Sequence, residues 1–268
     1  MLTKLGKNKI LWFLTALLSL AAALIGVVNP GIYSKVVNAE FLPGVISQDL
    51  TTIIASVIIL FCVVRTKERD FIKQIIVLGI TSYLFYAYGI YVIEQFYNAL
   101  YFLYMAIFGL SFYSIVYGVV NIRQDILKKV QLPKLMRNVS MGFLLFVPSL
   151  FIPLWISKLL PLIQNGQKIE FTYSIYILDL CFIMPLFIII AIMTAKKEGL
   201  GLLLAPALFI KGFTVLFPVG LAEILKILYN QTANTGGIWL YWGLSILFLM
   251  LVILYLRNLK ISGIGFNG

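Results

Sequence analysis

Two ionisable side chains lie deep inside long apolar runs of this sequence. Asp179 is flanked by apolar residues on both sides, and Lys211 follows Lys197 by fourteen residues in a run rich in Ala, Leu and Phe. A charge in such a run needs a partner from protein or water, so it marks a functional hypothesis by default. We expect Asp179 and Lys211 to meet. They would form either a structural lock between two helices or part of a substrate- or proton-linked site.

Asp49 and Glu223 are the other carboxylates assigned to this intramembrane polar site. Asp49 follows a stretch of mixed polarity and is expected to lie nearer to water than Asp179. Two interpretations of the aspartates stay open: they cap the outer ends of their helices, or they take part in the site. Glu223 is expected near the outer edge of its helix, where it would extend a polar path from Lys211.

Prolines and tyrosines supply candidate lining for a cavity. Pro185, Pro206 and Pro218 lie within apolar runs, where each frees a backbone carbonyl and permits a kink. Lys211 lies between the last two, and helices broken around a polar residue can line a binding site. Tyr83 and Tyr86 share a helix face, which could line a cavity for an apolar or aromatic ligand.

The composition excludes several kinds of catalysis. Histidine is absent, and the two cysteines, Cys62 and Cys181, lie in separate apolar runs. The usual zinc sites and histidine-dependent triads therefore cannot be assembled. The sequence contains no P-loop, no Gly-rich dinucleotide motif and no HExxH motif. We assign no catalytic residue, no metal site and no cofactor.

The composition of the whole chain is typical of a protein that is embedded in lipid. Of its 268 residues, 62% are apolar and 12% are charged. The apolar residues form blocks near the length of roughly 20 residues that a membrane-crossing helix needs. We therefore predict an all-α, polytopic transmembrane helical bundle. Its spans, about eight, are expected at 10–28, 49–65, 73–94, 99–120, 139–159, 174–195, 200–225 and 237–256.

The basic residues predict the orientation of these spans. Lys and Arg near span ends mark the cytoplasmic face. Of the 21 basic residues, sixteen fall on one side: Lys4, Lys7, Lys9, Arg65, Lys67, Arg69, Lys73, Arg123, Lys128, Lys129, Lys134, Arg137, Lys196, Lys197, Arg257 and Lys260. We therefore expect a multi-pass protein of the cell membrane with both termini cytoplasmic. The formal net charge of +11 is then a topology signal, and nucleic acid is not an expected partner.

An internal duplication is indicated by a shift of 130 residues. Positions 1–68 align with 131–198 without a gap and share 18 identities, among them Asp49 with Asp179 and Glu40-Phe41 with Glu170-Phe171. We predict a first four-span repeat at 1–120, a basic cytoplasmic linker at 121–138, and a second four-span repeat with a short cytoplasmic tail at 139–268. With four spans each, the repeats have the same orientation and are expected to be related by an axis along the membrane normal.

The segment from Leu178 to Gly212 carries a further signal. Its pattern Leu-Asp-Leu, Pro185, Lys-Lys-Glu-Gly-Leu-Gly, Leu-Ala-Pro and Lys-Gly resembles uncharacterised bacterial multi-spanning integral membrane proteins. The resemblance covers about 35 residues. It implies a multi-spanning membrane fold but no particular activity.

Three functions remain open from the sequence. The leading hypothesis is a transporter or carrier-like protein with a polar site between the repeats, around Asp179 and Lys211. The first alternative is a non-catalytic membrane subunit or assembly factor of a larger cell-envelope complex. The second is an intramembrane lipid-modifying enzyme. The lipid bilayer is the expected surrounding, and a protein partner or homo-oligomer and a small-molecule or lipid substrate are left open.

Overall fold

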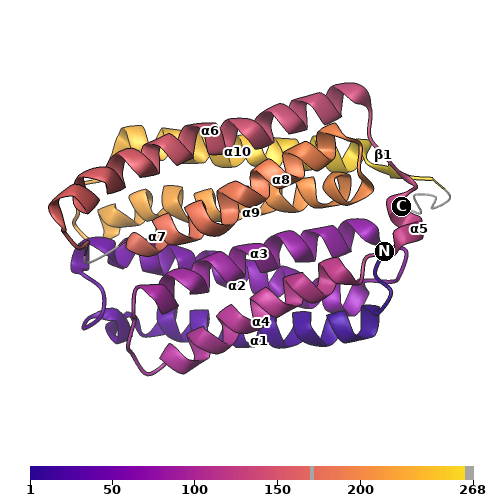
Figure 1. The fold of residues 1–268 in the computed structure, drawn as a ribbon. Coiled ribbons are helices and arrows are strands. Elements are labelled where there is room, and N and C mark those ends of the chain that lie inside the picture. The colour runs from indigo at the N-terminus through magenta and orange to yellow at the C-terminus, as the bar shows by residue number, and fades with distance from the viewer. Residues whose placement is uncertain (170–171, 263–268) are drawn as a thin grey trace. The chain divides into compact units, whose positions relative to one another are not determined.

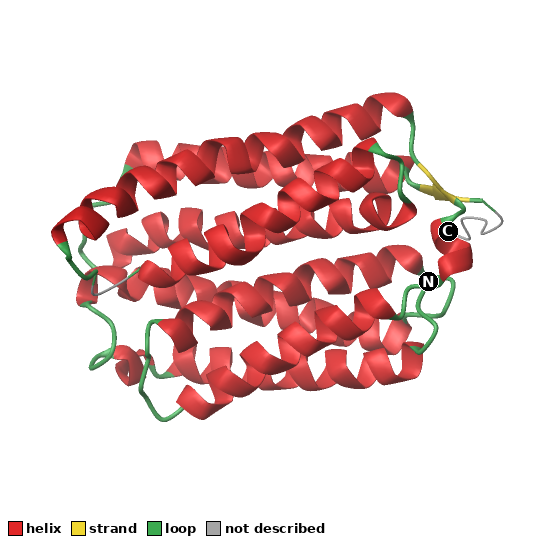
Figure 2. Cartoon of the chain, in the orientation of Figure 1, coloured by secondary structure: helices red, strands yellow, loops and turns green. Residues whose placement is uncertain are grey.

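The chain is almost entirely helical. A computed structural model describes residues 1–169 and 172–262 (Figure 2). Within these residues, eight helical segments are long and apolar enough to cross a membrane: Leu5–Val28, Ala39–Arg65, Phe71–Ile93, Tyr101–Val120, Lys134–Asn165, Tyr173–Ala195, Gly199–Leu228 and Thr235–Asn258. They confirm the predicted all-helical class and the expected spans. Such a set of helices is compatible with an integral membrane protein that crosses the bilayer several times.

The helices belong to two compact units. The first comprises Met1–Arg123 and Ala207–Ile253, and the second comprises Gln124–Pro206 and Leu254–Gly268. The division falls within two helices, α9 (Gly199–Leu228) and α10 (Thr235–Asn258).

The first unit is built on four long helices (Figure 1). They are α1 (Leu5–Val28), α2 (Leu42–Arg65), α3 (Phe71–Ile93) and α4 (Tyr101–Val120), and two short 3-10 helices, Pro30–Tyr33 and Ala39–Phe41, connect α1 to α2. Helix α1 packs against α2 and α4, and α3 packs against the same two helices. Large side chains such as Trp12, Tyr88 and Tyr104 are fully buried at the centre of this bundle.

Small residues bring α9 and α10 close to their neighbours in the first unit. A Cβ added at Gly79 of α3 would lie 2.6 Å from Cβ of Ile210 in α9. A Cβ added at Gly212 of α9 would overlap the ring of Phe248 in α10. Membrane helices depend on such close backbone approach because lipid supplies little hydrophobic force between them. These glycines therefore fix how α9 packs within this unit.

The second unit contains one long helix and one interrupted helix. Its elements are α5 (Gln124–Leu127), β1 (Val130–Gln131), α6 (Lys134–Asn165), α7 (Tyr173–Leu178), a π-helical turn (Asp179–Ile183), α8 (Met184–Ala195) and β2 (Lys260–Ile261). Helix α6 packs against α8. Strands β1 and β2 form a short antiparallel pair in which Val130 lies opposite Ile261.

The prolines act differently from expectation. Helix α9 stays continuous through Pro206 and Pro218, so Lys211 does not lie at a break in the helix. The interruption occurs instead in the sixth span, where the π-helical turn Asp179–Ile183 comes just before Pro185. Proline has no N–H to donate to the preceding turn. Wide π-helical turns within helices are frequent at functional sites.

Two details of the predicted organisation change in the structure. Lys134 and Arg137 lie in the first turn of α6 rather than in the connection before it. Helix α2 begins at Leu42, seven residues earlier than expected. The duplication, the linker boundaries and the orientation of the termini stay predictions, and the matched pair Glu170-Phe171 lies outside the described residues.

Candidate functional site

Asp49 lies inside helix α2 rather than at its end. Its side chain is 2% exposed, and α2 begins at Leu42 with Pro43 in its first turn. Proline suits that position, because the first N–H groups of a helix have no intrahelical acceptor. At 1.5 Å per residue, Asp49 lies roughly 10 Å along the helix. The interpretation of Asp49 as a helix cap is therefore wrong.

Two tyrosine hydroxyls hold the Asp49 carboxylate. The hydroxyl of Tyr33 donates to Oδ2 at 2.6 Å, and the hydroxyl of Tyr91 donates to Oδ1 at 3.1 Å. Tyr33 belongs to the connection after α1, and Tyr91 lies near the end of α3. Burial, and then the nearby Asp49 carboxylate, raise the pKa of Tyr33 well above its usual range. Tyr33 therefore keeps its proton and acts as a donor.

The absence of a side chain at Gly26 makes room for this arrangement. A Cβ added at Gly26 of α1 would overlap Oδ2 of Asp49 and the hydroxyl of Tyr33. Even alanine therefore does not fit here without displacing the carboxylate. The site is thus assembled by α1, its following connection, α2 and α3.

Aromatic rings enclose the donors. The ring of Tyr91 lies 5.0 Å, centroid to centroid, from those of Phe96 and Tyr104, and 5.6 Å from that of Tyr88. These rings pack in stacked and edge-to-face arrangements, which are favourable for aromatic pairs. A carboxylate beside such rings has little access to water, which strengthens each hydrogen bond that it accepts.

Tyr83 and Tyr86 were expected to line one cavity, but they have different partners. Tyr83 is fully buried, and its hydroxyl lies 3.1 Å from Oγ1 of Thr52 and donates to the carbonyl of Gln48. Tyr86 instead presents its ring to Nζ of Lys211, which lies 4.0 Å from the ring centroid. Tyr83 therefore belongs to the polar face of α2 around Asp49, whereas Tyr86 belongs with α9.

Lys211 is a buried cation within the first unit. Its side chain is 4% exposed, and the contact with Tyr86 is a cation–π interaction, which gains strength where water is excluded. One turn further on, the hydroxyl of Thr214 donates to the carbonyls of Ile210 and Lys211. The Lys211 side chain, which the sequence places deep within an apolar helix, is thus also removed from solvent in the structure.

Asp179 occupies the start of the π-helical turn in the second unit. It is 6% exposed, and its Oδ2 accepts a hydrogen bond of 2.9 Å from Nε1 of Trp155 in α6. Nζ of Lys158 lies 5.2 Å from the centroid of the Trp155 ring. Asp179 and Lys211 belong to different compact units, and their pairing stays a prediction.

Glu223 joins the end of α9 to the start of α10. Its Oε1 accepts a hydrogen bond of 2.7 Å from Nζ of Lys226, and its Oε2 accepts one of 2.9 Å from the backbone N–H of Asn234. Both carboxylate oxygens are thus engaged at the α9–α10 turn. These bonds are those of a local brace, and a polar path from Glu223 to Lys211 stays a prediction.

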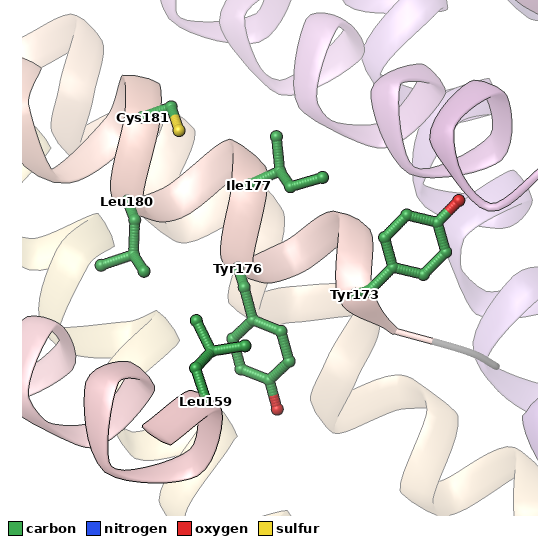
Figure 3. Close-up of a pocket in the computed structure, with 6 residues that line it drawn as sticks. All are labelled: Leu159, Tyr173, Tyr176, Ile177, Leu180 and Cys181. Atoms are coloured by element: carbon green, nitrogen blue, oxygen red, sulfur yellow. The ribbon is translucent and has the colours of Figure 1, made fainter. Parts of the chain in front are cut away.

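A pocket of about 280 Å³ lies beside the π-helical turn of the second unit (Figure 3). Its lining is apolar and aromatic, from Leu159, Tyr173, Tyr176, Ile177, Leu180 and Cys181. The ring of Tyr176 packs edge-on against Trp155, with ring centroids 5.2 Å apart. The pocket therefore adjoins the residue that holds Asp179, and Pro185 follows one turn later.

The described residues offer no cluster for a metal. Within residues 1–169 and 172–262, no three His, Cys, Asp or Glu side chains come together as a metal ion would need. Asp49 and Asp179 instead each accept hydrogen bonds from aromatic side chains. Each carboxylate is thus held by uncharged hydrogen-bond donors.

Sequence reasoning found the buried charges but missed their partners. Tyr33, Tyr91 and Trp155 come from elements distant in the sequence, and uncharged aromatic residues are common in membrane helices. Only Trp155 carried a usable signal, because an indole N–H within an apolar span needs an acceptor. Gly26 had no signal at all.

No protein-family model, curated protein or solved structure matches this chain. The site must therefore be interpreted from its own chemistry.

Proposed function

We propose that this chain is a multi-pass transporter or carrier-like protein whose intramembrane polar residues are Asp49, Lys211 and Asp179. The observation that carries the proposal is Asp49, which is 2% exposed within an apolar span and bonded to two tyrosine hydroxyls. A carboxylate at that depth is costly, and such residues mark ion pathways and proton relays in membrane proteins.

Lys211 adds a group that an anionic substrate could use. Its ammonium lies 4.0 Å from the centroid of the Tyr86 ring, and a cation in a site removed from water attracts a carboxylate or phosphate strongly. Asp49 and Lys211 therefore provide one site for a proton or a cation and one site for an anion within the first unit. Coupling a substrate to an ion needs two such sites.

The duplication supports a carrier architecture. Shifted by 130 residues, Leu42–Arg65 falls on 172–195, and the sixth span runs over Tyr173–Ala195. Both segments carry a buried aspartate at the matched position. Parallel repeats of this kind form the halves of some secondary transporters, which work by rocking one half against the other. We propose the cytoplasmic orientation of both termini on the distribution of basic residues.

The experiment is electrical recording from proteoliposomes on a solid support. Amino acids, sugars, organic acids, nucleosides and quaternary ammonium ions are applied in turn, with and without a pH gradient. We expect at least one class to produce a current in the parent protein and Asp49→Asn to reduce it at least tenfold. The control is Glu40→Gln, which makes the same chemical change at an exposed carboxylate and should leave the current unchanged.

A folded Asp49→Asn protein that carries the full current would refute the role of Asp49. If no class produces a current and another protein consistently co-purifies from the membrane, the chain is a subunit of a larger complex instead.

A further inference from the structure

One buried face of α1 carries polar side chains along much of its length. On α1, the buried face carries Asn8, Trp12, Thr15 and Ser19, which are spaced three or four residues apart and end about two turns before Gly26 with its neighbour Asp49. The distance from Asn8 to Gly26 is roughly 27 Å along the helix. A hydrocarbon core is about 30 Å thick. The polar face of α1 and the Asp49 site beyond it together therefore span nearly the thickness of that core.

Several buried polar atoms of α1, α3 and α4 have no protein partner. Within the described residues, Oδ1 of Asn8, Nε1 of Trp12, Oγ1 of Thr81, Oγ of Ser111 and Oγ of Ser114 are buried and accept or donate no hydrogen bond. Leaving such groups dry costs free energy, and native proteins satisfy nearly all of them with protein or ordered water. Each of these atoms therefore needs a partner that the chain does not supply.

Helical register brings three of these atoms to one level. A Cβ added at Gly118 of α4 would lie 2.8 Å from Cδ2 of Leu78 in α3 and 3.6 Å from Oδ1 of Asn8 in α1. One helical turn further into the bundle, α1 presents Trp12 and α3 presents Thr81. The antiparallel helix α4 presents Ser114 at the same level.

A water molecule fits the chemistry of this level. Buried waters bind two to four polar groups, and the three side chains supply an indole donor and two hydroxyls. Asn8 lies one turn below Trp12, and Ser111 lies about one turn above Ser114. Polar atoms thus recur at intervals that a file of hydrogen-bonded waters can span.

Hydroxyl groups continue the path toward Asp49. Oγ of Ser19 lies 2.8 Å from Oγ of Ser56, which projects from α2. On the same face of α2, Ser56 is followed at helical spacing by Thr52 and then Asp49. Oγ1 of Thr52 also lies 3.1 Å from the hydroxyl of Tyr83. The hydroxyls of Ser19, Ser56 and Thr52 thus lead toward the Asp49 carboxylate, and each of them can both donate and accept a hydrogen bond.

We propose that the interior of the α1–α4 bundle binds a file of ordered water beside Trp12, Thr81 and Ser114, and that this file carries protons to Asp49. The proposal rests on the transporter function above and names the proton as its coupled ion. When Asp49 accepts a proton from the nearest group, that group regains one from its neighbour. Each proton that reaches Asp49 is thus matched by one that enters at the far end, near Asn8.

The first test asks whether the site is wet. The protein is labelled with ¹⁵N at tryptophan and studied by NMR in detergent micelles. The signal of the Trp12 indole N–H is assigned by its loss in Trp12→Phe. This signal should show a magnetisation-transfer peak to bound water. Ser114→Ala should lower the melting temperature, because it removes a water ligand. Ser157→Ala, at an exposed serine that bonds its own helix, should change it little. A missing water peak, together with a higher melting temperature for Ser114→Ala, would overturn the proposal.

The second test asks whether the path carries protons. In proteoliposomes loaded with a pH-sensitive dye, an external acid pulse should acidify the interior through the parent protein. Ser114→Val, which fills the water position, should slow this at least tenfold. If the water peak is present but Ser114→Val conducts as the parent does, the water is structural and the proton path is wrong. The water measurement does not depend on transport. Its result therefore holds even if the Asp49→Asn variant carries the same substrate current as the parent protein.

Discussion

Asp49 and Gly26 depend on each other. The carboxylate of Asp49 sits where a side chain on Gly26 would be, and it reaches Tyr33 only because that space is open. In a densely packed interior, one additional methyl group forces neighbouring side chains from their preferred positions. The helix interface between α1 and α2 is therefore shaped around a charged group rather than around apolar packing.

Gly26→Ala should destabilise the protein by about 1–3 kcal/mol, the usual cost of forcing extra volume into a packed interior. Gly109→Ala in α4 is the control, because a Cβ at Gly109 meets nothing within 4 Å. Its effect should stay within about 1 kcal/mol. Unfolding by sodium dodecyl sulfate in mixed micelles measures both. Equal effects of the two changes would mean that the Asp49 carboxylate does not occupy this space.

At the residue scale, the sequence singled out the buried ionisable residues but placed Asp49 nearer to water than Asp179, whereas Asp49 is 2% and Asp179 6% exposed. Asp49, Asp179 and Lys211 stand out because ionisable residues are rare in apolar runs. Their partners are ordinary members of such runs, and Tyr33 and Tyr91 reach Asp49 from elements on either side of α2. Pairings of this kind follow from packing, which a single sequence does not reveal.

Among the elements, a buried amide helps to hold the end of the first unit opposite Asp49. Gln74 in the first turn of α3 is fully buried. Its Oε1 accepts from the N–H of Leu2 at 3.0 Å, and its Nε2 donates to the carbonyls of Lys67 and Glu68 at 3.1 and 3.2 Å. One side chain thus joins the segment before α1 to the loop between α2 and α3.

Gln74→Leu should cost about 1–3 kcal/mol, because it removes the partners of backbone groups that stay buried. Gln124→Leu provides the matched control at an exposed glutamine, and its effect should be within about 0.5 kcal/mol. Hydrogen exchange provides a second measurement: Gln74→Leu should speed exchange at Leu2. If that amide exchanges at the parental rate, Gln74 does not hold this segment.

For the elements, hydropathy predicted every span and misplaced some boundaries. The second span is expected to start at Asp49, whereas α2 begins at Leu42 and has Pro43 within its first turn. The π-helical turn at Asp179 has no hydropathy signal. The pairing of Val130 with Ile261 was not predicted either, because a two-residue strand pair between distant segments leaves no periodic pattern.

For the whole molecule, the orientation in the membrane stays a prediction from the charges near the span ends. Within the first unit, the structure joins the segment before α1 to both the α2–α3 loop and the end of α4. Leu2 N–H binds Gln74, and Thr3 Oγ1 donates to the carbonyl of Asn121. These three segments carry many of the basic residues assigned to the cytoplasmic face. The proposal that this end of the bundle is cytoplasmic rests on these basic residues.

Labelling of single cysteines tests this orientation. In a protein with Cys62 and Cys181 replaced by alanine, Lys168→Cys and Thr232→Cys should react with a membrane-impermeant maleimide added to intact cells. Arg69→Cys and Lys128→Cys should react only after the membrane is permeabilised. All four positions are exposed on the protein, so only the membrane decides whether the maleimide reaches them. The reverse pattern would invert the proposed topology.

The predicted pairing of Asp179 with Lys211 is a test of how the whole molecule is assembled, because the two residues belong to different compact units. Both side chains are more than nine-tenths buried. Breaking a buried pair by removing one partner costs about 3–5 kcal/mol, because the other charge is left uncompensated. Asp179→Asn and Lys211→Met should each destabilise the protein by that amount. The double variant should recover much of the loss, with a coupling energy above about 1 kcal/mol.

Asp70 and Lys73 provide the control pair for this cycle. Their ion pair is 3.1 Å long but partly exposed, and exposed pairs contribute at most about 1 kcal/mol. If the stability losses of the two single variants simply add in the Asp179–Lys211 double variant, the residues do not meet and Trp155 is the main partner of Asp179.

Coupling alone does not assign a role to the pair, so the substrate current of the double variant is measured as well. A coupled pair whose double variant is folded and fully active is a structural lock, whereas a folded but silent double variant places the pair in the transport mechanism.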